Sequence, residues 1–565
     1  MTIRSVWSAL CAGVALLAPL PLAAQRLTPP RDDERCAGER IVGVAITGLR
    51  RDITDRLGKL GAFVNASARS LQPQTNPEVI SRFLLLHVGD VCDEQRRAES
   101  ERILRAQPFI SDAVIRAERV ADGEVRLLVE TIDEYVLFLA AWGISGVPIG
   151  FEVGTGNLFG GTHAVAGTLE YGRGGSVGGG VKYTNYQAFG QPLVLRSYVA
   201  SRPLWRYGGL SLERPFLTNF QRDSWQVGAR YSRGFITFRD PSFRDVSIDY
   251  LRRDWGASYS RREMNPRGGA NVGIVAAGEL ADPLRTVAIR ENGPVPTPAP
   301  LLLLRYQAFE SARLGFSAGY GRIRFLPVRG LDYLSAPQDL SLGWNASIVG
   351  LSSLNVLARE KRDWIGVASL FGAAGSEVSA VQASAAVETR VSTGHNSLPG
   401  VIGSGRVGWF GKTSVGHVTS LAVEFAGGVR TRLPMQLTFR DDDGLIGYRS
   451  QDFGGGQRTI ARFEDRYTIP SPSAKVELAV AGLFQAGRLV AGDATYGITT
   501  PWRYGVGVAL IGAIPAGAKH SVRLEFGVPL NPARSRALEF RIGYGDRTVF
   551  FGGEPSAISN AREAR

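Results

Sequence analysis

The stretch that decides the fold is residues 522–528, which read Val-Arg-Leu-Glu-Phe-Gly-Val. Apolar side chains stand at every second position, and Arg523, Glu525 and Gly527 alternate with them. A period of two residues predicts a β-strand with one apolar and one polar face. Such a strand separates an apolar environment from a polar one.

The same alternation recurs through most of the chain, beginning near residue 150. Further examples are residues 163–171, 225–233, 418–425 and 538–544. A soluble sandwich also alternates, but many such segments with 69 glycines favour a transmembrane antiparallel β-barrel. We expect about sixteen strands between residues 135 and 551, with the region 268–420 ambiguous by two. Phe550 and Phe551 are expected to end the barrel, followed by a disordered polar tail, residues 552–565.

The first 24 residues resemble a signal peptide. Arg4 precedes an apolar run from Ala9 to Leu22, and the small pair Ala23-Ala24 follows it. The run is too short to span a bilayer as a helix. The chain has a net charge of +13, which would suit an anionic partner. Because an exported protein does not meet nucleic acid in the cell interior, we expect anionic lipid headgroups to be that partner.

Residues 25–134 predict a small α/β domain in front of the barrel. A strand covers 41–49, and Asn76-Pro77 is a typical start for a helix. Asp93 precedes a second helix, and two alternating segments flank the turn at Asp122-Gly123, which predicts a hairpin. The expected order is therefore strand, helix, helix, strand, strand.

Two cysteines, Cys36 and Cys92, remain after removal of the signal peptide. An even number of cysteines in an exported chain favours a disulfide. The alternative is two unrelated buried thiols.

Several short motifs resemble one known superfamily, the outer-membrane protein assembly factors and bacterial surface antigens. In the N-terminal domain these are residues 99–105, 108–110 and 130–133, which resemble a polypeptide-transport-associated (POTRA) domain. Early in the barrel, residues 157–161 resemble the first periplasmic turn. In the last third they are residues 447–448, 463–466 and 484–487. Relatives include the barrel-assembly and translocation-assembly insertases and the two-partner secretion transporters. The resemblance implies a sixteen-stranded barrel and a periplasmic POTRA domain that receives polypeptides by β-strand addition.

The chain departs from the superfamily pattern at two positions. Ile446 stands where relatives carry arginine, and Gln485 stands where they carry aspartate. Because both residues are neutral, a loop covering 431–457 can still fold into the lumen without a stranded charge. Arg449 would pair with Glu464 or Glu477, or else it is a solvated loop residue. The predicted loop latch is Ile446, Gly447, Tyr448, Arg449, Glu464, Arg466, Glu477 and Gln485.

These observations predict a protein that assists insertion or translocation of polypeptides across the outer membrane of a Gram-negative-type bacterium. The alternatives are a passive or specialised transport pore and a structural surface antigen without assembly activity. The sequence contains no nucleophile elbow, phosphate loop or cysteine cluster, so we expect no enzyme, cofactor or metal. The expected partners are outer-membrane lipids and lipopolysaccharide, unfolded or exported polypeptide clients, and periplasmic chaperones or accessory lipoproteins.

Overall fold

A computed structural model describes most of residues 27–562. It leaves out 50–73, 135–136, 143–148, 172–176, 203, 241–244, 266–267, 291–292, 355–362, 393–398, 415, 441–443, 449–452, 471–475, 532–537 and 546–553 within that range. The expected signal peptide, Arg449, Phe550 and Phe551 therefore lie outside the described residues.

In its described residues, 27–49 and 74–134, the N-terminal domain is a three-stranded sheet with two α-helices and one 3₁₀ helix. Its elements are η1 (Asp32–Glu34), β1 (Arg40–Leu49), α3 (Pro77–Ser81), α4 (Glu94–Arg105), β2 (Ile110–Ala121) and β3 (Glu124–Asp133). The strand order is β1-β3-β2, with β1 parallel and β2 antiparallel to β3. Asn76 and Asp93 cap α3 and α4 through the backbone N–H groups of Glu78 and Arg96. The predicted element order is confirmed.

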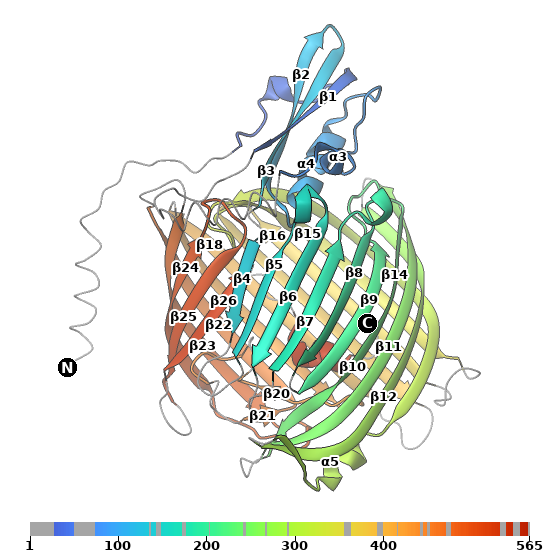
Figure 1. The fold of residues 1–565 in the computed structure, drawn as a ribbon, viewed down its shortest axis with the longest axis vertical. Coiled ribbons are helices and arrows are strands. Elements are labelled where there is room, and N and C mark those ends of the chain that lie inside the picture. The colour runs from blue at the N-terminus through green and yellow to red at the C-terminus, as the bar shows by residue number, and fades with distance from the viewer. Residues whose placement is uncertain are drawn as a thin grey trace, which may run out of the picture.

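The rest of the chain is mainly β, in one large antiparallel sheet that closes into a barrel (Figure 1). Its strands are β4 (Leu137–Trp142), β5 (Ile149–Thr155), β6 (His163–Tyr171), β7 (Val177–Asn185), β8 (Val194–Arg202), β9 (Trp205–Arg214), β10 (Asp223–Arg239), β11 (Asp245–Asn265), β12 (Gly268–Arg290), β14 (Phe309–Arg329), β15 (Pro337–Ser353), β16 (Asp363–Gly375), β17 (Ser379–Ser392), β18 (Gly400–Ser414), β19 (His417–Val429), β22 (Gln457–Ile469), β23 (Glu477–Val490), β24 (Arg503–Ala513), β25 (Ser521–Pro529) and β26 (Glu539–Gly545). No helix among the described residues is long and apolar enough to cross a membrane.

The expected number of sixteen strands is wrong. Among the described residues, twenty-one strands belong to the closed sheet. Of these, β13 (Gly293–Pro296) pairs only with β12, so the other twenty complete the circuit. The prediction fell short because alternation is faint where small residues occupy both faces. In β17, for example, the sequence Ser-Ala-Val-Gln-Ala-Ser-Ala-Ala offers little contrast between the faces.

The predicted assignment of side chains to the outer and lumenal faces is confirmed on β22. On β22, Phe463 and Tyr467 are exposed on the outside, whereas Arg462, Glu464 and Arg466 are buried in the interior. This parity is the alternation of a pleated strand. The charged side chains of Arg462, Glu464 and Arg466 on β22 therefore point into the lumen.

The N-terminal domain stands over one end of the barrel, which we call the near mouth (Figure 1). The opposite end, the far mouth, carries α5 (Pro300–Arg305), which follows the β12–β13 hairpin. Short 3₁₀ turns, η3 (Leu158–Gly160) and η5 (Ala188–Gly190), connect strands at the near mouth. A backbone hydrogen bond links the domain to one of these turns: the N–H of Asn76 donates to the carbonyl oxygen of Gly160 at 3.0 Å.

The tail after the barrel is not disordered where the structure describes it. Residues 554–562 contain the helix α6 (Ser556–Ala561), and Ile558 and Ala561 are buried in a cluster inside the barrel. The short red helix lies within the barrel outline in Figure 1. Six residues with one isoleucine and two alanines gave too weak an apolar signal to predict this burial.

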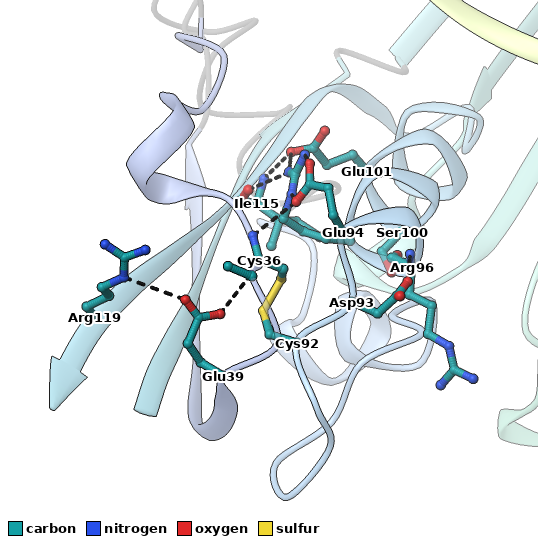
Figure 2. The surroundings of a disulfide bond; sticks show 12 residues. Cys36, Glu39, Cys92, Asp93, Glu94, Arg96, Ser100, Glu101, Ile115 and Arg119 are labelled. Carbon is teal, nitrogen blue, oxygen red and sulfur yellow. Dashed lines mark hydrogen bonds and ion pairs between the residues drawn. A yellow bond between two sulfur atoms is a disulfide. The ribbon is translucent and has the colours of Figure 1, made fainter. Parts of the chain in front are cut away.

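A disulfide joins Cys36 to Cys92, with 5.1 Å between their Cα atoms (Figure 2). It ties the segment before β1 to the residue before the cap of α4. The N–H of Cys36 also donates to Glu94 at 3.1 Å.

Replacement of both cysteines by serine is expected to destabilise the N-terminal domain by about 4 kcal/mol in the chain-entropy model, because the bond spans 56 residues. The measurement is hydrogen exchange of β1–β3 amides in the whole protein. Unchanged protection in the double variant would contradict the prediction, and reductant added to the wild-type protein serves as the matched comparison.

Candidate functional site

The lumen loop, residues 431–457, folds into the barrel where the structure describes it, at 431–440, 444–448 and 453–457. Leu445, Ile446 and Tyr448 are completely buried. The N–H of Ile446 donates to Oε1 of Gln485 on β23 at 2.9 Å. The hydroxyl of Tyr448 donates to Tyr504 O at 3.1 Å and to Asn531 Oδ1 at 2.8 Å. The loop is therefore fixed to the wall formed by β23, β24 and the segment after β25.

Glycines in the barrel wall make room for the loop. A Cβ atom at Gly527 would lie 2.4 Å from Cγ1 of Ile446, and one at Gly505 would lie 2.3 Å from Ile446 O. Gly507 faces the same side chain, with its Cβ position 3.0 Å from Cδ1. Atoms this close would overlap, so only glycine allows the loop to lie against these strands.

The sequence predicted contact between positions 446 and 485, and this contact is made through the backbone of Ile446. The side chain of Ile446 points instead at the glycines of β24 and β25. Glutamine suits this arrangement, since its neutral oxygen accepts one N–H without a counterion. Ile446, Gly447, Tyr448 and Gln485 thus come together as predicted.

The charged members of the predicted latch do not join this group. Glu464 pairs with Arg523 at 2.6 Å, and Arg523 also pairs with Glu525 at 2.6 Å. Arg466 donates to three backbone carbonyls of the β14–β15 turn, at Gly330, Leu331 and Asp332. Glu477 is buried at the opposite end of β23 from the loop. Whether Arg449 pairs with Glu464 or Glu477 lies outside the described residues.

A second plug, which the sequence did not predict, enters from the near mouth. The turn at residues 330–336 is held by Arg466, and Leu334 is buried in one apolar cluster with Ile446. Gly330, Asp332 and Pro337 are typical turn residues, but nothing near them in the sequence shows that this turn enters the lumen. The lumen loop and the near-mouth turn meet along β23 and β24.

The N-terminal domain is fixed to the near mouth by buried charges. Arg105 of α4 pairs with Asp339 of β15 at 2.7 Å, and Asp112 of β2 pairs with Arg329 at 2.9 Å. Glu134 accepts the N–H of Lys519 from the β24–β25 turn at 3.0 Å. Because β15 and β25 are far apart in the circuit, these contacts hold the domain across the opening.

Two shifted pKa values follow from this interface. Burial lowers the pKa of Arg105, but the charges of Asp339 and Glu101 outweigh it and leave that pKa raised. Burial raises the pKa of Glu99, but its hydrogen bond and ion pair with Arg102 outweigh burial and leave it below the ordinary 4.5. A lowered carboxyl pKa contributes stability above the unfolded value, and this contribution is lost as the pH falls through the folded value. The contact at Glu99 is therefore stronger at neutral pH than in acid.

The two edges of the small sheet differ. On β2, Glu101 accepts the N–H of Ile115 at 2.7 Å, and Arg97 and Arg105 donate to Ile115 O and Ala113 O. On β1, residues 39–41 bond to residues 89–92, and Gln74 caps Gly48 O. Between these points, β3 is the one strand that pairs with β1 in the described part of the chain.

A cavity with several polar side chains in its lining lies inside the lumen, along β11 to β19. Its volume is about 680 Å³, and its lining includes Arg262, Asn345, Ser384, Ser404 and Arg406. A smaller cavity of about 190 Å³ shares Phe216 and Arg262 with it and extends to Arg102 of α4. The space inside the barrel therefore continues to the N-terminal domain.

Comparisons with known proteins give structural matches alone. No protein-family model matches the chain, and no curated protein does. One solved structure is BamA from Haemophilus ducreyi lacking POTRA domains 1–3, at 14% identity and a TM-score of 0.36, covering 89% of this chain and 84% of that one. CdiB from Acinetobacter baumannii matches at 10% identity and a TM-score of 0.36, covering 96% of both chains. CdiB from Escherichia coli matches at 12% identity and a TM-score of 0.40, covering 96% of this chain and 97% of that one. These scores are too low to carry an argument about function.

Proposed function

We propose that this chain is an outer-membrane barrel protein of the assembly-factor superfamily that assists insertion or translocation of polypeptides. The N-terminal domain acts as its POTRA domain in the periplasm and receives clients by β-strand addition. The observation that carries the proposal is an edge strand, β1, on a domain fixed by buried ion pairs over the mouth of a polar lumen.

The client edge is β1 and not β2. Strand addition needs backbone N–H and C=O groups that point away from the sheet. Side chains of α4 already bond those groups of β2 at Ala113 and Ile115. The central part of β1, residues 43–47, is flanked by bonded ends and is long enough for a short extended segment.

The membrane assignment is supported by the outward apolar face of the barrel and by the signal peptide predicted from the sequence. Apolar side chains such as Val423, Phe463 and Phe484 face outward, while the lumen is charged. A closed barrel satisfies its backbone groups within the sheet, which is what a bilayer requires. The proposed partners are outer-membrane lipids and lipopolysaccharide, polypeptide clients, and periplasmic chaperones or accessory lipoproteins.

A photoreactive residue at Ala45 or Thr47 in cells tests the proposal, because these side chains lie on the face of β1 opposite Val44 and Ile46, which pack against the domain core. We expect crosslinks to unfolded or exported polypeptides from both positions, because an added strand would lie within van der Waals distance of β1. The matched control is Glu118 on β2, which is also exposed. Crosslinks to clients from Glu118 but not from β1 would contradict the edge assignment, and none from either edge would contradict strand addition.

A transport pore is the second candidate, and the cavity of about 680 Å³ inside the barrel favours it. A pore would pass ions continuously, whereas the loop and the near-mouth turn fill the β22–β25 side of the lumen. Conductance of the purified protein in planar bilayers separates the two functions. A large steady conductance without any client would favour the pore.

A further inference from the structure

The post-barrel segment, residues 554–562, lies in a built site inside the lumen. Arg252 of β11 donates to Arg562 O at 2.8 Å and also to Asn560 O. The guanidinium of Arg562 donates to Ala386 O of β17 at 3.0 Å. Ser404 of β18 donates to Glu554 at 2.6 Å. Three separate strands of the wall thus hold one short segment.

The segment is also internally closed. Arg562 and Glu554 form an ion pair at 2.6 Å, with further bonds of 3.0 Å from Nε to both carboxylate oxygens. A bidentate pair of this kind fixes the geometry of both groups. Glu554 precedes α6 and Arg562 follows it, so the ion pair links the residues on either side of the helix and makes the segment compact.

The apolar side of α6 completes the contact. Ile558 is completely buried and Ala561 is 4% exposed, in one cluster with Tyr306 after α5 and with Leu437 and Phe439 of the lumen loop. The anchoring Arg252 is itself only 5% exposed and pairs with Glu279 at 2.6 Å. The guanidinium of Arg252 donates to two backbone carbonyls of the segment, and hydrogen bonds from a charged donor are stronger than those between neutral groups.

The segment lies between the cavity in the lumen and the apolar cluster that includes the lumen loop. Glu554 and Pro555 line the cavity of about 680 Å³, whereas Ile558 belongs to the cluster that includes the lumen loop and the residues around α5. Its departure would enlarge the cavity toward the far mouth. It would also expose the carbonyl-binding face of Arg252.

We propose that the lumen contains a peptide-binding site that residues 554–562 occupy in cis, and that release of this segment opens the lumen to another polypeptide segment. The ligand class is a short helical peptide with a small apolar face and an acidic and a basic residue at its ends. This site is separate from the β1 edge and does not require the function proposed above.

The first test uses protein truncated after Gly553 and a fluorescent peptide of residues 554–565. We expect saturable binding to the truncated barrel and at least tenfold weaker binding to the full chain, whose own segment competes. Ile558→Asp in the peptide should weaken binding at least tenfold, because it would bury a charge. Ser556→Asp is the matched control on the exposed side of α6, with little expected change.

The wall is tested in the truncated protein with Arg252→Ala, which should weaken binding, and with its neighbour Arg253→Ala as control. Arg253 lies 5.9 Å from the Tyr231 ring and takes no part in the site. If truncation prevents folding, full-length Ile558→Asp takes its place as the released form.

Conductance gives the second readout. Truncated or Ile558→Asp protein should show larger unit conductance than the wild type, and added peptide should reduce the conductance of the truncated form. Equal conductance together with no saturable peptide binding would overturn the proposal. Failure of client crosslinking at β1 with peptide binding intact would contradict only the proposed function.

Discussion

Alanine at Arg105 is expected to lower the stability of the docked N-terminal domain by about 3–5 kcal/mol, the cost of breaking a buried ion pair. Arg105 is 9% exposed and pairs with Asp339 on the barrel, and it also lies 3.7 Å from Glu101. Its removal leaves two buried carboxylates with less positive charge around them. Denaturant titration of the whole protein, followed by hydrogen exchange in α4, measures the effect.

The matched control is Arg82→Ala. Arg82 pairs with Glu78 at 2.6 Å, but both side chains are exposed, so the loss should stay below about 1 kcal/mol. Asp339→Ala combined with Arg105→Ala should show a coupling of about 1–3 kcal/mol. Additive effects would mean that Arg105 stabilises α4 and not the contact between domain and barrel.

Gly447→Ala is expected to release the lumen loop from the wall. Gly447 has φ +85°, which costs about 1–3 kcal/mol for other residues. Its Cβ would also lie 2.5 Å from Pro529 N, and overpacking of this kind costs about 1–3 kcal/mol more. Because the clash is with backbone, no side-chain rotation relieves it.

The measurement for Gly447→Ala is limited proteolysis of residues 431–457 in folded protein. The loop should become cleavable while the barrel keeps its heat-modifiable mobility in electrophoresis. Gly482→Ala on β23 is the control, since its Cβ would meet no atom within 4 Å. A protected loop in Gly447→Ala would show that docking does not depend on this turn.

Local chemistry predicted part of the fold well. Helix caps at Asn76 and Asp93 and the turn at Asp122-Gly123 depend on nearby residues, and these elements appear where expected. Strand parity at Phe463 and Glu464 is also local, because pleating alone decides which side chain faces the lumen. The meeting of Ile446 with Gln485 came from the superfamily resemblance.

Long-range features were not predictable in the same way. The role of Gly505, Gly507 and Gly527 depends on a loop 60 to 80 residues earlier in sequence, roughly, so nothing beside them signals it. Arg466 was placed correctly in the lumen, yet its carbonyl partners at 330–332 come from a distant turn. The strand count failed for a different reason, since alanine and serine fit either face of a strand.

The separation along the chain between the post-barrel segment and its partners has a consequence for folding kinetics. Arg562 bonds to a carbonyl 176 residues earlier, and its own carbonyl bonds to Arg252, 310 residues earlier. Loops of this length close only after the intervening chain has ordered, because the entropy of closure must first be offset by other contacts. We therefore expect residues 554–562 to dock after β11, β17 and β18 have ordered, and protection of the Ile558 amide from solvent exchange to mark molecules in which this part of the wall has formed.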